Sequence, residues 1–498
     1  MSQSTRFLQR SAVLNGLFAI EGASMFVLDV VLAAALGLGA HSDSLYAAWS
    51  LPLVIGRGAF QSLTNSLIGL FNDEVDEDLI YSQALTVIGV FSFIAALLMS
   101  LTSRWWFPLS VPGATAETQQ LGVPLAAILA WLIAFLALAE TQRAIYYRHG
   151  KNHIPSFARV AGVFVSMGLV WMSAADQNLT LAAIGLAAGA AVEMLLGFVG
   201  LMGMGRRFRP AWPAGDGLRR MARIVGLPLV GQGVLIGAST AERAIASYLG
   251  PGAVTAVTYA ARIFQMMERF VFRGFVISTI QTYVAGAAAN WRRDTRILLL
   301  LSVPMMVIFA VLPTQLITIV FERGRFTAES TQLVALALRF YAFAIPILAF
   351  NRIPFALAFA RGKSRDLLIY SLLYTITLIG SVSMLVTFGV GLPAFGLAYI
   401  AALSVGTYWL YARVMGDLDA AGWTVDEALR LLGVALIALA GTALIVYFID
   451  ENTGSTLNVW LTALAGGAGC LLLTAGAAWL FRLPEVGRIF SLLHQTNR

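Results

Sequence analysis

Long apolar runs, separated by short polar or glycine-containing stretches, recur along the whole chain. Each run reaches the roughly 20 mostly apolar residues that an α-helix needs to cross a bilayer. The pattern predicts fourteen spanning helices, and an even number places both ends of the chain on the same side of the membrane. They lie near residues 11–37, 46–71, 79–101, 121–142, 155–174, 179–203, 223–249, 253–287, 296–321, 332–359, 367–389, 392–412, 429–449 and 456–481.

Basic residues are distributed unevenly among the loops between these segments. With the N-terminus in the cytoplasm, the outer loops carry only Arg104, Arg323 and Arg325, and the other basic loop residues face the cytoplasm. Lys and Arg are enriched in cytoplasmic loops of membrane proteins. We therefore expect an all-α polytopic membrane protein with both termini in the cytoplasm.

Composition supports this class of protein. Of the 498 residues, 59% are hydrophobic and 12% are charged, whereas soluble domains have about 45–50% apolar and about 25% charged residues. A soluble enzyme and a disordered chain are thereby excluded. The net charge of +7 follows from the loop bias, so no nucleic-acid partner is expected.

Residues that hold metals, nucleotides or reacting groups are scarce. The single cysteine, Cys470, can form neither an internal disulfide nor a cysteine metal site. Gly362-Lys363-Ser364 resembles the end of a phosphate-binding loop, but Leu357 stands where that motif requires glycine. No metal, cofactor or catalytic residue is therefore predicted. A membrane enzyme with a catalytic outer loop is a minor alternative, because the longest predicted outer loop covers only residues 102–120.

The chain contains an internal repeat. Three pairs of blocks match at an offset of 213 or 212 residues, namely 36–40 (LGLGA) with 249–253 (LGPGA), 46–48 (YAA) with 259–261 (YAA), and 115–117 (TAE) with 327–329 (TAE). The offset covers six predicted helices. An even number gives two lobes of the same orientation, related by an axis along the membrane normal.

The repeat predicts the domain organisation. Residues 1–205 form an N-lobe, residues 206–415 form a C-lobe, and residues 416–498 add an interfacial segment, two extra helices and an amphipathic tail. Two parallel six-helix lobes around a central cavity are typical of transporters that work by alternating access. The expected fold is therefore such a pair of lobes with two additional C-terminal helices.

Ionisable residues concentrate in the helices that begin each lobe. Such residues are costly inside a bilayer and usually face a protein interior or a water-filled cavity. The first lobe has Glu21, Asp29 and Arg57, the second has Glu242, Arg243, Arg262, Glu268, Arg269 and Arg273, and the other spans have Glu140, Glu193, Arg339 and Arg352. Two interpretations remain open, because these charges could neutralise one another or contact a substrate.

Arg262 is the leading candidate for substrate contact, and Arg352 is the second. The neighbours of Arg262 one helical turn away are Thr258 and Met266. Its anion is therefore expected from another helix or from a substrate phosphate, which a guanidinium binds through two parallel hydrogen bonds. The second helix is expected to break at Pro52, with Gly56 beyond it, and interrupted helices are tolerated where backbone lines a cavity. Pro52 and Gly56 therefore mark a candidate gate.

Three motifs resemble those of one membrane-protein family. Residues 29–52 follow the order D-x(7)-G-x-G-x(3)-D-x(8)-P, residues 259–262 (YAAR) are similar to a YYADR segment, and residues 321–327 (FERGRFT) are similar to F-x-x-G-x-F-T. In this order they resemble the MviN/MurJ lipid II flippases, within the multidrug/oligosaccharidyl-lipid/polysaccharide exporter superfamily. The resemblance extends over nearly the whole chain.

The resemblance implies roles for particular residues. Arg262 matches a cavity arginine that faces the lipid diphosphate, and Asp29 and Asp43 match aspartates in the first helix and the loop after it. With Arg57 and Arg352, they make up the expected substrate-binding set.

Some arginines of the family pattern are missing from this chain. Gly22 and Leu28 occupy arginine positions of the first helix, and Gly56 replaces the first of a paired Arg-Arg, which leaves Arg57. These losses fit a divergent member that moves lipid II or another polyprenyl-diphosphate glycan.

Together with the repeat and the membrane charges, the resemblance implies a flippase of the bacterial cytoplasmic (inner) membrane. It would move a polyprenyl-diphosphate-linked saccharide, either lipid II or an exopolysaccharide repeat unit, by alternating access. The polyprenyl tail is expected in a groove that the last two helices help to form. A coupling cation is expected at Glu242 or Asp29, with a structural ion pair as the alternative. The alternative function is a cation-coupled multidrug antiporter of the same superfamily. The expected partners are the lipid-linked glycan and membrane lipid, and the chain is expected to be a monomer.

Overall fold

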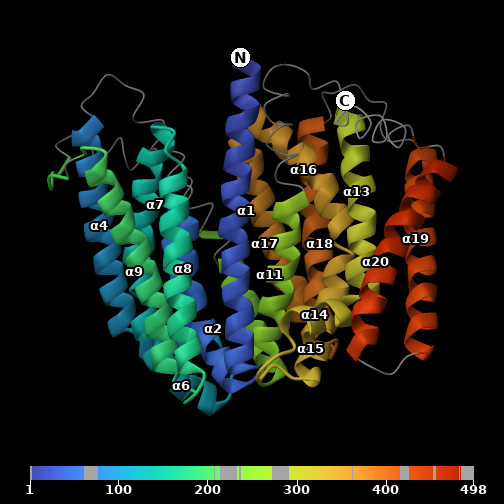
Figure 1. Cartoon of the computed structure of the whole chain (residues 1–498), viewed down its shortest axis with the longest axis horizontal. Coiled ribbons are helices and arrows are strands. Elements are labelled where there is room, and N and C mark those ends of the chain that lie inside the picture. Colours follow the sequence, from blue (N-terminus) through green and yellow to red (C-terminus); the bar gives the residue numbers. More distant parts are fainter. Residues whose placement is uncertain are drawn as a thin grey trace. The chain divides into compact units, whose positions relative to one another are not determined.

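The computed structural model describes most of the chain as α-helix (Figure 1). The described residues are 3–60, 77–206, 208–213, 233–234, 237–271, 291–361, 363–415, 425–452, 456–481 and 483. Within these ranges no β-strand occurs. The prediction of an all-α polytopic fold is confirmed.

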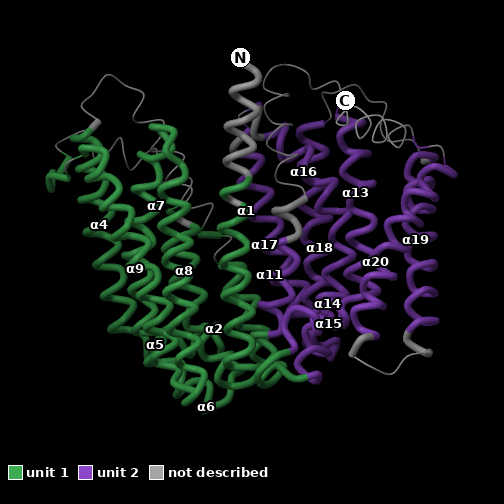
Figure 2. Tube along the Cα trace, viewed as in Figure 1, with its two compact units in different colours: residues 1–255, 323–327 green, residues 256–322, 328–498 purple. Residues whose placement is uncertain are grey.

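The chain divides into two compact units, coloured separately in Figure 2. Unit 1 comprises Met1–Thr255 and Arg323–Thr327. Its helices are α1 (Gln3–Leu36), α2 (Ala40–Leu53), the π-helix η1 (Val54–Ala59), α4 (Glu77–Leu101), α5 (Ser103–Ser110), α6 (Ala116–Leu129), α7 (Leu132–Arg148), α8 (His153–Ser173), α9 (Leu179–Gly203) and the short 3-10 helix η2 (Ser247–Leu249).

Unit 2 comprises Ala256–Glu322 and Ala328–Arg498. Its helices are α11 (Ala253–Val271), which begins in unit 1, α13 (Trp291–Val311), α14 (Pro313–Phe321), α15 (Ala328–Ala342), α16 (Ile345–Ala360), α17 (Ser364–Thr387), α18 (Pro393–Leu410), the π-helix η4 (Tyr411–Met415), α19 (Val425–Asn452) and α20 (Thr456–Leu480). The lobe boundaries at 205 and 415 stay a prediction.

Ten helical segments of the described ranges are long and apolar enough to cross a membrane. An eleventh span is obtained if α15 and α16, which are bent by 47° to each other, count as one. The remaining predicted spans, near 46–71, 223–249 and 253–287, extend into residues outside the described ranges. The count of fourteen therefore stays a prediction.

Polar side chains begin two of these helices. Thr115 accepts a hydrogen bond from the backbone N–H of Thr118 at the start of α6 (3.3 Å), and Asn178 accepts one from Leu181 at the start of α9 (3.0 Å). Such caps satisfy amide groups that have no partner inside the helix. Thr115 opens a repeated block, and its counterpart Thr327 directly precedes α15, so the repeat marks the same kind of helix start twice.

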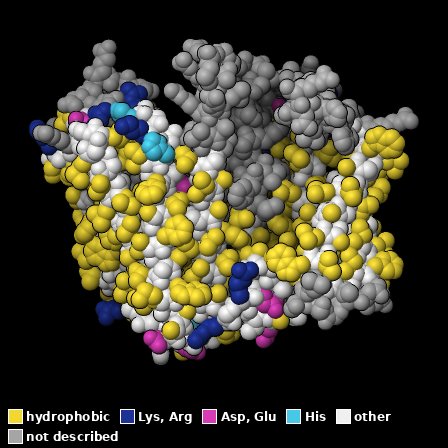
Figure 3. Space-filling model, in the orientation of Figure 1, with side chains coloured by type: hydrophobic (Ala, Val, Ile, Leu, Met, Phe, Trp, Pro, Cys, Tyr) yellow, Lys and Arg dark blue, Asp and Glu magenta, His cyan; other side chains and the backbone are white. Residues whose placement is uncertain are grey.

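Hydrophobic side chains cover the flank of unit 1, while charged residues gather mainly at its two ends (Figure 3). Large apolar side chains are exposed on α4, α8 and α9, among them Phe91, Phe164 and Leu195 at 57%, 62% and 55%. Exposed apolar surface of this extent is suited to contact with lipid tails rather than water.

The expected break of the second helix at Pro52 is not observed. Pro52 lies inside α2, and the helix continues directly into η1 at Val54. Because proline lacks an N–H, one backbone hydrogen bond is missing at this point, and the chain responds by widening to a π-helix. π-Helical turns are rare and often lie at functional sites.

Candidate functional site

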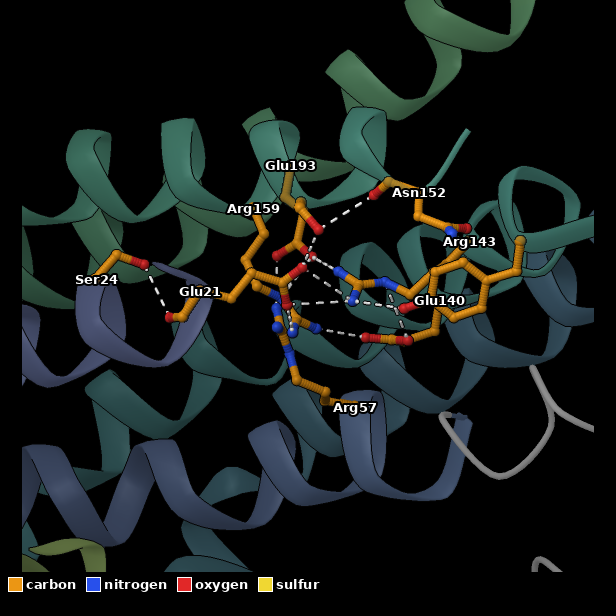
Figure 4. A network of polar contacts seen from close by, with 10 residues as sticks. Glu21, Ser24, Arg57, Glu140, Arg143, Asn152, Arg159 and Glu193 are labelled. Carbon is orange, nitrogen blue, oxygen red and sulfur yellow. Dashed lines mark hydrogen bonds and ion pairs between the residues drawn. The ribbon is translucent and has the colours of Figure 1, made fainter. Parts of the chain in front are cut away.

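Six charged side chains meet in the interior of unit 1 (Figure 4). They come from five different helices and comprise three glutamates and three arginines: Glu21 (α1), Arg57 (η1), Glu140 and Arg143 (α7), Arg159 (α8) and Glu193 (α9). We call this set the charge network. Its formal charges cancel, which is the condition for placing ions in a low-dielectric interior.

Arg159 is the centre of the charge network. Its Nη1 donates to Glu21 (2.5 Å), its Nη2 to Glu140 (2.7 Å) and its Nε to Glu193 (3.2 Å). One guanidinium thus binds three carboxylates, one through each nitrogen. The planar fork of arginine allows this arrangement, whereas the single ammonium of lysine does not.

The glutamates are almost fully buried and have more than one partner each. Glu21 is 3% exposed and also accepts hydrogen bonds from Ser156 (2.5 Å) and Arg143 (3.2 Å). Glu140 and Glu193 are 1% and 5% exposed. Removing one partner from such a set leaves an uncompensated buried charge, which costs about 3–5 kcal/mol.

Arg57, a predicted substrate-binding residue, is part of the charge network. Its Nη2 donates to Glu193 at 2.5 Å, and its side chain is 19% exposed. η1 places it there because Gly56 lets the turn approach α7, where a Cβ on Gly56 would lie only 2.8 Å from the Leu132 carbonyl oxygen. The first of the expected alternatives, mutual neutralisation of charges, is therefore observed for Arg57 in this state.

Sequence reasoning missed two members of the charge network. The loop-charge pattern places Arg143 and Arg159 with the cytoplasmic basic residues, although the predicted span 155–174 already contains Arg159. Both side chains are buried, at 3% and 11% exposure. The spacing of Glu140 and Arg143, three residues apart on α7, was an available signal, because such residues share a helix face. Without these two arginines, the loop bias toward one side remains.

Asp43, another predicted substrate-binding residue, lies outside the charge network. It lies near the start of α2, is 3% exposed, and accepts hydrogen bonds from the backbone N–H of Gly252 (2.7 Å), the N–H of Thr255 (2.8 Å) and the hydroxyl of Thr255 (2.5 Å). The carboxylate thereby caps α11. Burial raises the pKa of Asp43 to about 6, although these three hydrogen bonds act in the opposite direction.

The two ion-coupling candidates lie on helical segments of unit 1. Asp29 of α1 is 5% exposed and accepts a long hydrogen bond of 3.5 Å from the Tyr46 hydroxyl. Glu242 is helical and half-buried. In the described part of the chain, no group of three or more His, Cys, Asp or Glu side chains is arranged to hold a metal ion.

Arg262 and Arg352 are both half-buried residues of unit 2 helices, α11 and α16 respectively. Beside Arg352 on α16, the buried Asn351 donates to the Thr407 hydroxyl of α18 (2.9 Å) and accepts from the Tyr370 hydroxyl of α17 (3.4 Å). Three helices are thus joined by polar side chains next to Arg352.

Unit 2 also contains an apolar groove with a volume of about 750 Å³. Its walls come from α13, from the end of α15 and the start of α16, and from α19, and include Met306, Phe343, Phe350 and Leu436. An ion pair between Arg296 of α13 and Glu427 of α19 (2.7 Å) joins two of the walls near one end. The groove has the size and lining of a site for an apolar ligand.

Known proteins share this fold. A solved lipid II flippase MurJ in its inward closed conformation matches with a TM-score of 0.80 and 16% identity, over 95% of this chain and 99% of that one. An inward-facing multidrug resistance MATE family transporter matches with a TM-score of 0.65 and 16% identity, over 79% and 94%. At these identities the matches show the fold alone, which defines a multi-pass membrane protein of the architecture common to MurJ and MATE transporters.

Sequence comparison is more specific. The family model for Lipid II flippase MurJ matches residues 32–463. The probable lipid II flippases MurJ of Thermotoga maritima and Rhizobium meliloti are 20% identical over 425 residues and 25% identical over 410 residues. These alignments cover 84% and 75% of this chain, and 87% and 74% of the relatives. The chain belongs to the Lipid II flippase MurJ family, and the predicted family is confirmed.

Proposed function

We propose that this chain is a flippase that moves a polyprenyl-diphosphate-linked saccharide, lipid II or a related glycan, across the cytoplasmic membrane. The observation that carries the proposal, beside family membership, is the apolar groove of unit 2. A polyprenyl chain is an extended hydrocarbon, and burying it against Met306, Phe343 and Leu436 is favourable by about 25 cal/mol per Å² of apolar surface. α19, which forms one wall, is one of the two extra C-terminal helices.

The diphosphate binds arginines of unit 2 in this proposal. Arg352 lies on α16, the helix that also supplies Phe350 to the groove. Residues two positions apart on a helix point in nearly opposite directions, so α16 offers one face to the tail and another to the charged headgroup. Arg262 on α11 is the second proposed diphosphate ligand, on the strength of the family motif that it ends.

The charge network is an argument against function as a multidrug antiporter. A cationic drug requires carboxylates that are available to it, but Glu21, Glu140 and Glu193 each bind at least one arginine in the charge network. We assign Arg57 the role of exchanging between Glu193 and substrate as η1 moves, with Pro52 and Gly56 as the hinge of that movement.

We assign Asp43 the role of holding the start of α11 against α2, rather than direct contact with the substrate. Its carboxylate is buried and holds the start of α11 through Gly252 and Thr255. Breaking these hydrogen bonds frees the outer end of α2 from α11. For the remaining features we propose cytoplasmic termini, a monomer, and coupling to a cation or to the membrane potential through Asp29 or Glu242.

Complementation tests the proposed function. A bacterium depleted of its own lipid II flippase is supplied with this chain, and growth is scored together with lipid II on the outer leaflet. We expect rescue by the wild-type chain, loss of rescue in Arg262→Ala and Arg352→Ala, and no effect of Arg104→Ala, a matched change at an exposed arginine. Protein levels are measured in every strain.

If the well-expressed wild-type chain does not rescue growth, the transported substrate is another lipid-linked glycan. That glycan is identified by deleting the gene in its host and finding the saccharide lipid that accumulates. Absence of any accumulated saccharide lipid in that strain contradicts the proposed function. Equal rescue by Arg262→Ala and Arg352→Ala contradicts their proposed role.

A further inference from the structure

Aromatic side chains form a continuous cluster in unit 2 beside Arg352. Tyr370 and Tyr374 of α17 are stacked, with ring centres 6.3 Å apart and an interplanar angle of 23°. Tyr374 meets Tyr399 of α18 edge to face, with centres 5.9 Å apart. Behind them, Tyr399 packs against Phe264 of α11 (5.3 Å) and Tyr341 of α15 (5.6 Å).

The members of this cluster differ in exposure. Phe264 and Tyr341 are 2% and 1% exposed, so they serve as packing. Tyr370, Tyr374 and Tyr399 are only partly buried, so part of each residue remains accessible. A tyrosine that is needed only for packing would be expected to resemble Tyr341.

Polar groups border the three half-buried rings. Arg352 directly follows Asn351 on α16. Behind Tyr370, the 2% exposed Asn351 accepts a hydrogen bond from its hydroxyl and donates one to Thr407, which holds that tyrosine in place. Tyr370 also packs closely on Gly406 of α18, where a Cβ would lie 2.6 Å from the ring. These contacts restrain the Tyr370 side chain.

We propose that Tyr370, Tyr374 and Tyr399, together with Arg352, form the surface that binds the saccharide part of the lipid-linked substrate. A pyranose ring has an apolar face of C–H groups and a rim of hydroxyls. Partly accessible aromatic side chains match the first, and a guanidinium and phenolic hydroxyls match the second. The inference rests on the proposed function and adds the residues that distinguish a sugar-bearing lipid from a bare one.

The position of Arg352 supports this assignment. If Arg352 binds the diphosphate, the sugar that is attached directly to that diphosphate comes within reach of residues adjacent to Arg352. Tyr370 is hydrogen-bonded to Asn351, the residue next to Arg352 in α16, and through Tyr374 it is connected to Tyr399. A side chain that is already restrained, as Tyr370 is, also loses less conformational entropy on binding.

Binding to the full-length chain in lipid nanodiscs tests the inference with two ligands, lipid II and the same polyprenyl diphosphate without sugar. We expect Tyr374→Leu and Tyr399→Leu to weaken lipid II binding about tenfold each, without changing binding of the sugar-free lipid. Tyr374→Phe retains the ring and is expected to bind nearly as the wild type. Tyr408→Leu is the matched control on α18, because Tyr408 is 75% exposed and lies outside the cluster.

A second measurement needs no variant. Bound lipid II is expected to protect Tyr374 and Tyr399 of the wild-type chain from nitration, while the sugar-free lipid does not, and Tyr408 reacts in all cases. Equal affinity of the wild type for the two lipids, or equal loss of both ligands in the leucine variants, overturns the saccharide surface and leaves the flippase proposal standing. A wild-type chain that binds neither lipid overturns the flippase proposal and the surface with it.

Discussion

Asp43 and Thr255 are joined by two hydrogen bonds, from the backbone N–H and from the hydroxyl of Thr255 to the same carboxylate oxygen, at 2.8 and 2.5 Å. Thr255 is the repeat counterpart of Ser42, whose hydroxyl accepts from the Gly39 N–H at the start of its own helix. The two helix starts are therefore related in sequence but capped in different ways. The first is capped locally, and the second is capped by an aspartate from the first.

The Asp43 cap is expected to make stability depend on pH. The pKa of Asp43 is raised by burial from 3.8 to about 6, so the folded chain retains this proton at a pH where the unfolded chain has lost it. Stability from this group is complete below about pH 4 and is lost as the pH rises through 6. Between pH 5 and 7 the loss is on the order of 1 kcal/mol.

Thermal unfolding of the purified chain at several pH values measures this dependence. Asp43→Asn, which cannot ionise, is expected to lack that part of the slope, so the wild type gains on the variant as the pH falls. Parallel profiles for the two proteins would show that Asp43 does not titrate in this range.

The stability of the charge network is expected to depend on whether its positive and negative charges cancel, rather than on any single charged residue. Glu193→Gln leaves a net positive charge in the interior and is expected to lower the free energy of unfolding by about 3–5 kcal/mol. The double variant Arg57→Gln, Glu193→Gln restores neutrality and is expected to recover part of that loss. Thermal unfolding of the two single variants and the double variant gives the coupling between the residues.

Glu117→Gln serves as the matched control for the charge network, because Glu117 is exposed at the start of α6, and its effect is expected within about 0.5 kcal/mol. Additive losses in the double variant would mean that Arg57 and Glu193 act independently.

Two neighbouring glycines of η1 are expected to behave differently. A Cβ on Gly56 would lie 2.8 Å from the Leu132 carbonyl oxygen and 3.0 Å from the Ile133 Cα, whereas one on Gly58 would meet only a Val54 methyl group at 3.4 Å. Gly56→Ala must therefore displace η1 from α7, at a cost of about 1–3 kcal/mol, and Gly58→Ala should be nearly silent. Unfolding and outer-leaflet lipid II assays of both variants check this, and equal effects would contradict it.

Filling the apolar groove is expected to block lipid binding without unfolding the chain. Ala435 lines the groove on α19, and a tryptophan there occupies volume that the polyprenyl tail needs. Ala435→Trp is expected to weaken binding of sugar-free polyprenyl diphosphate at least tenfold. Leu444→Trp, at a position of α19 that is 57% exposed and outside the groove lining, is the control. Unchanged affinity in Ala435→Trp would place the tail elsewhere.

The sequence predicted the helical class and the family because both follow from local properties. A membrane span is recognisable from about 20 apolar residues in a row. The helices at 77–101, 153–173 and 179–203 agree with the predicted ones to within two residues at every end. The family motif at residues 29–52 could likewise be recognised from the sequence alone.

The hydrogen-bond and ion-pair partners of individual residues could not be predicted in the same way. Arg159 and Glu21 are 138 residues apart in the chain, and Asp43 and Thr255 are 212 apart. Which charge meets which depends on how helices pack. Arg159 lies inside the predicted span 155–174, but only the packing of four helices brings it to its three glutamates. A helix break predicted from Pro52 became a π-turn for the same reason, since neighbouring helices decide how a missing hydrogen bond is accommodated.

The sequence by itself determined that this chain lies in a membrane as a bundle of helices, because water and lipid sort residues by their own polarity. It also determined the family. Only the tertiary structure decided that Arg57 neutralises Glu193, that Asp43 caps α11, and that three tyrosines of α17 and α18 pack together. Ion pairs, caps and ring contacts require atoms a few ångströms apart, and that proximity is created by packing between segments that are distant in the sequence.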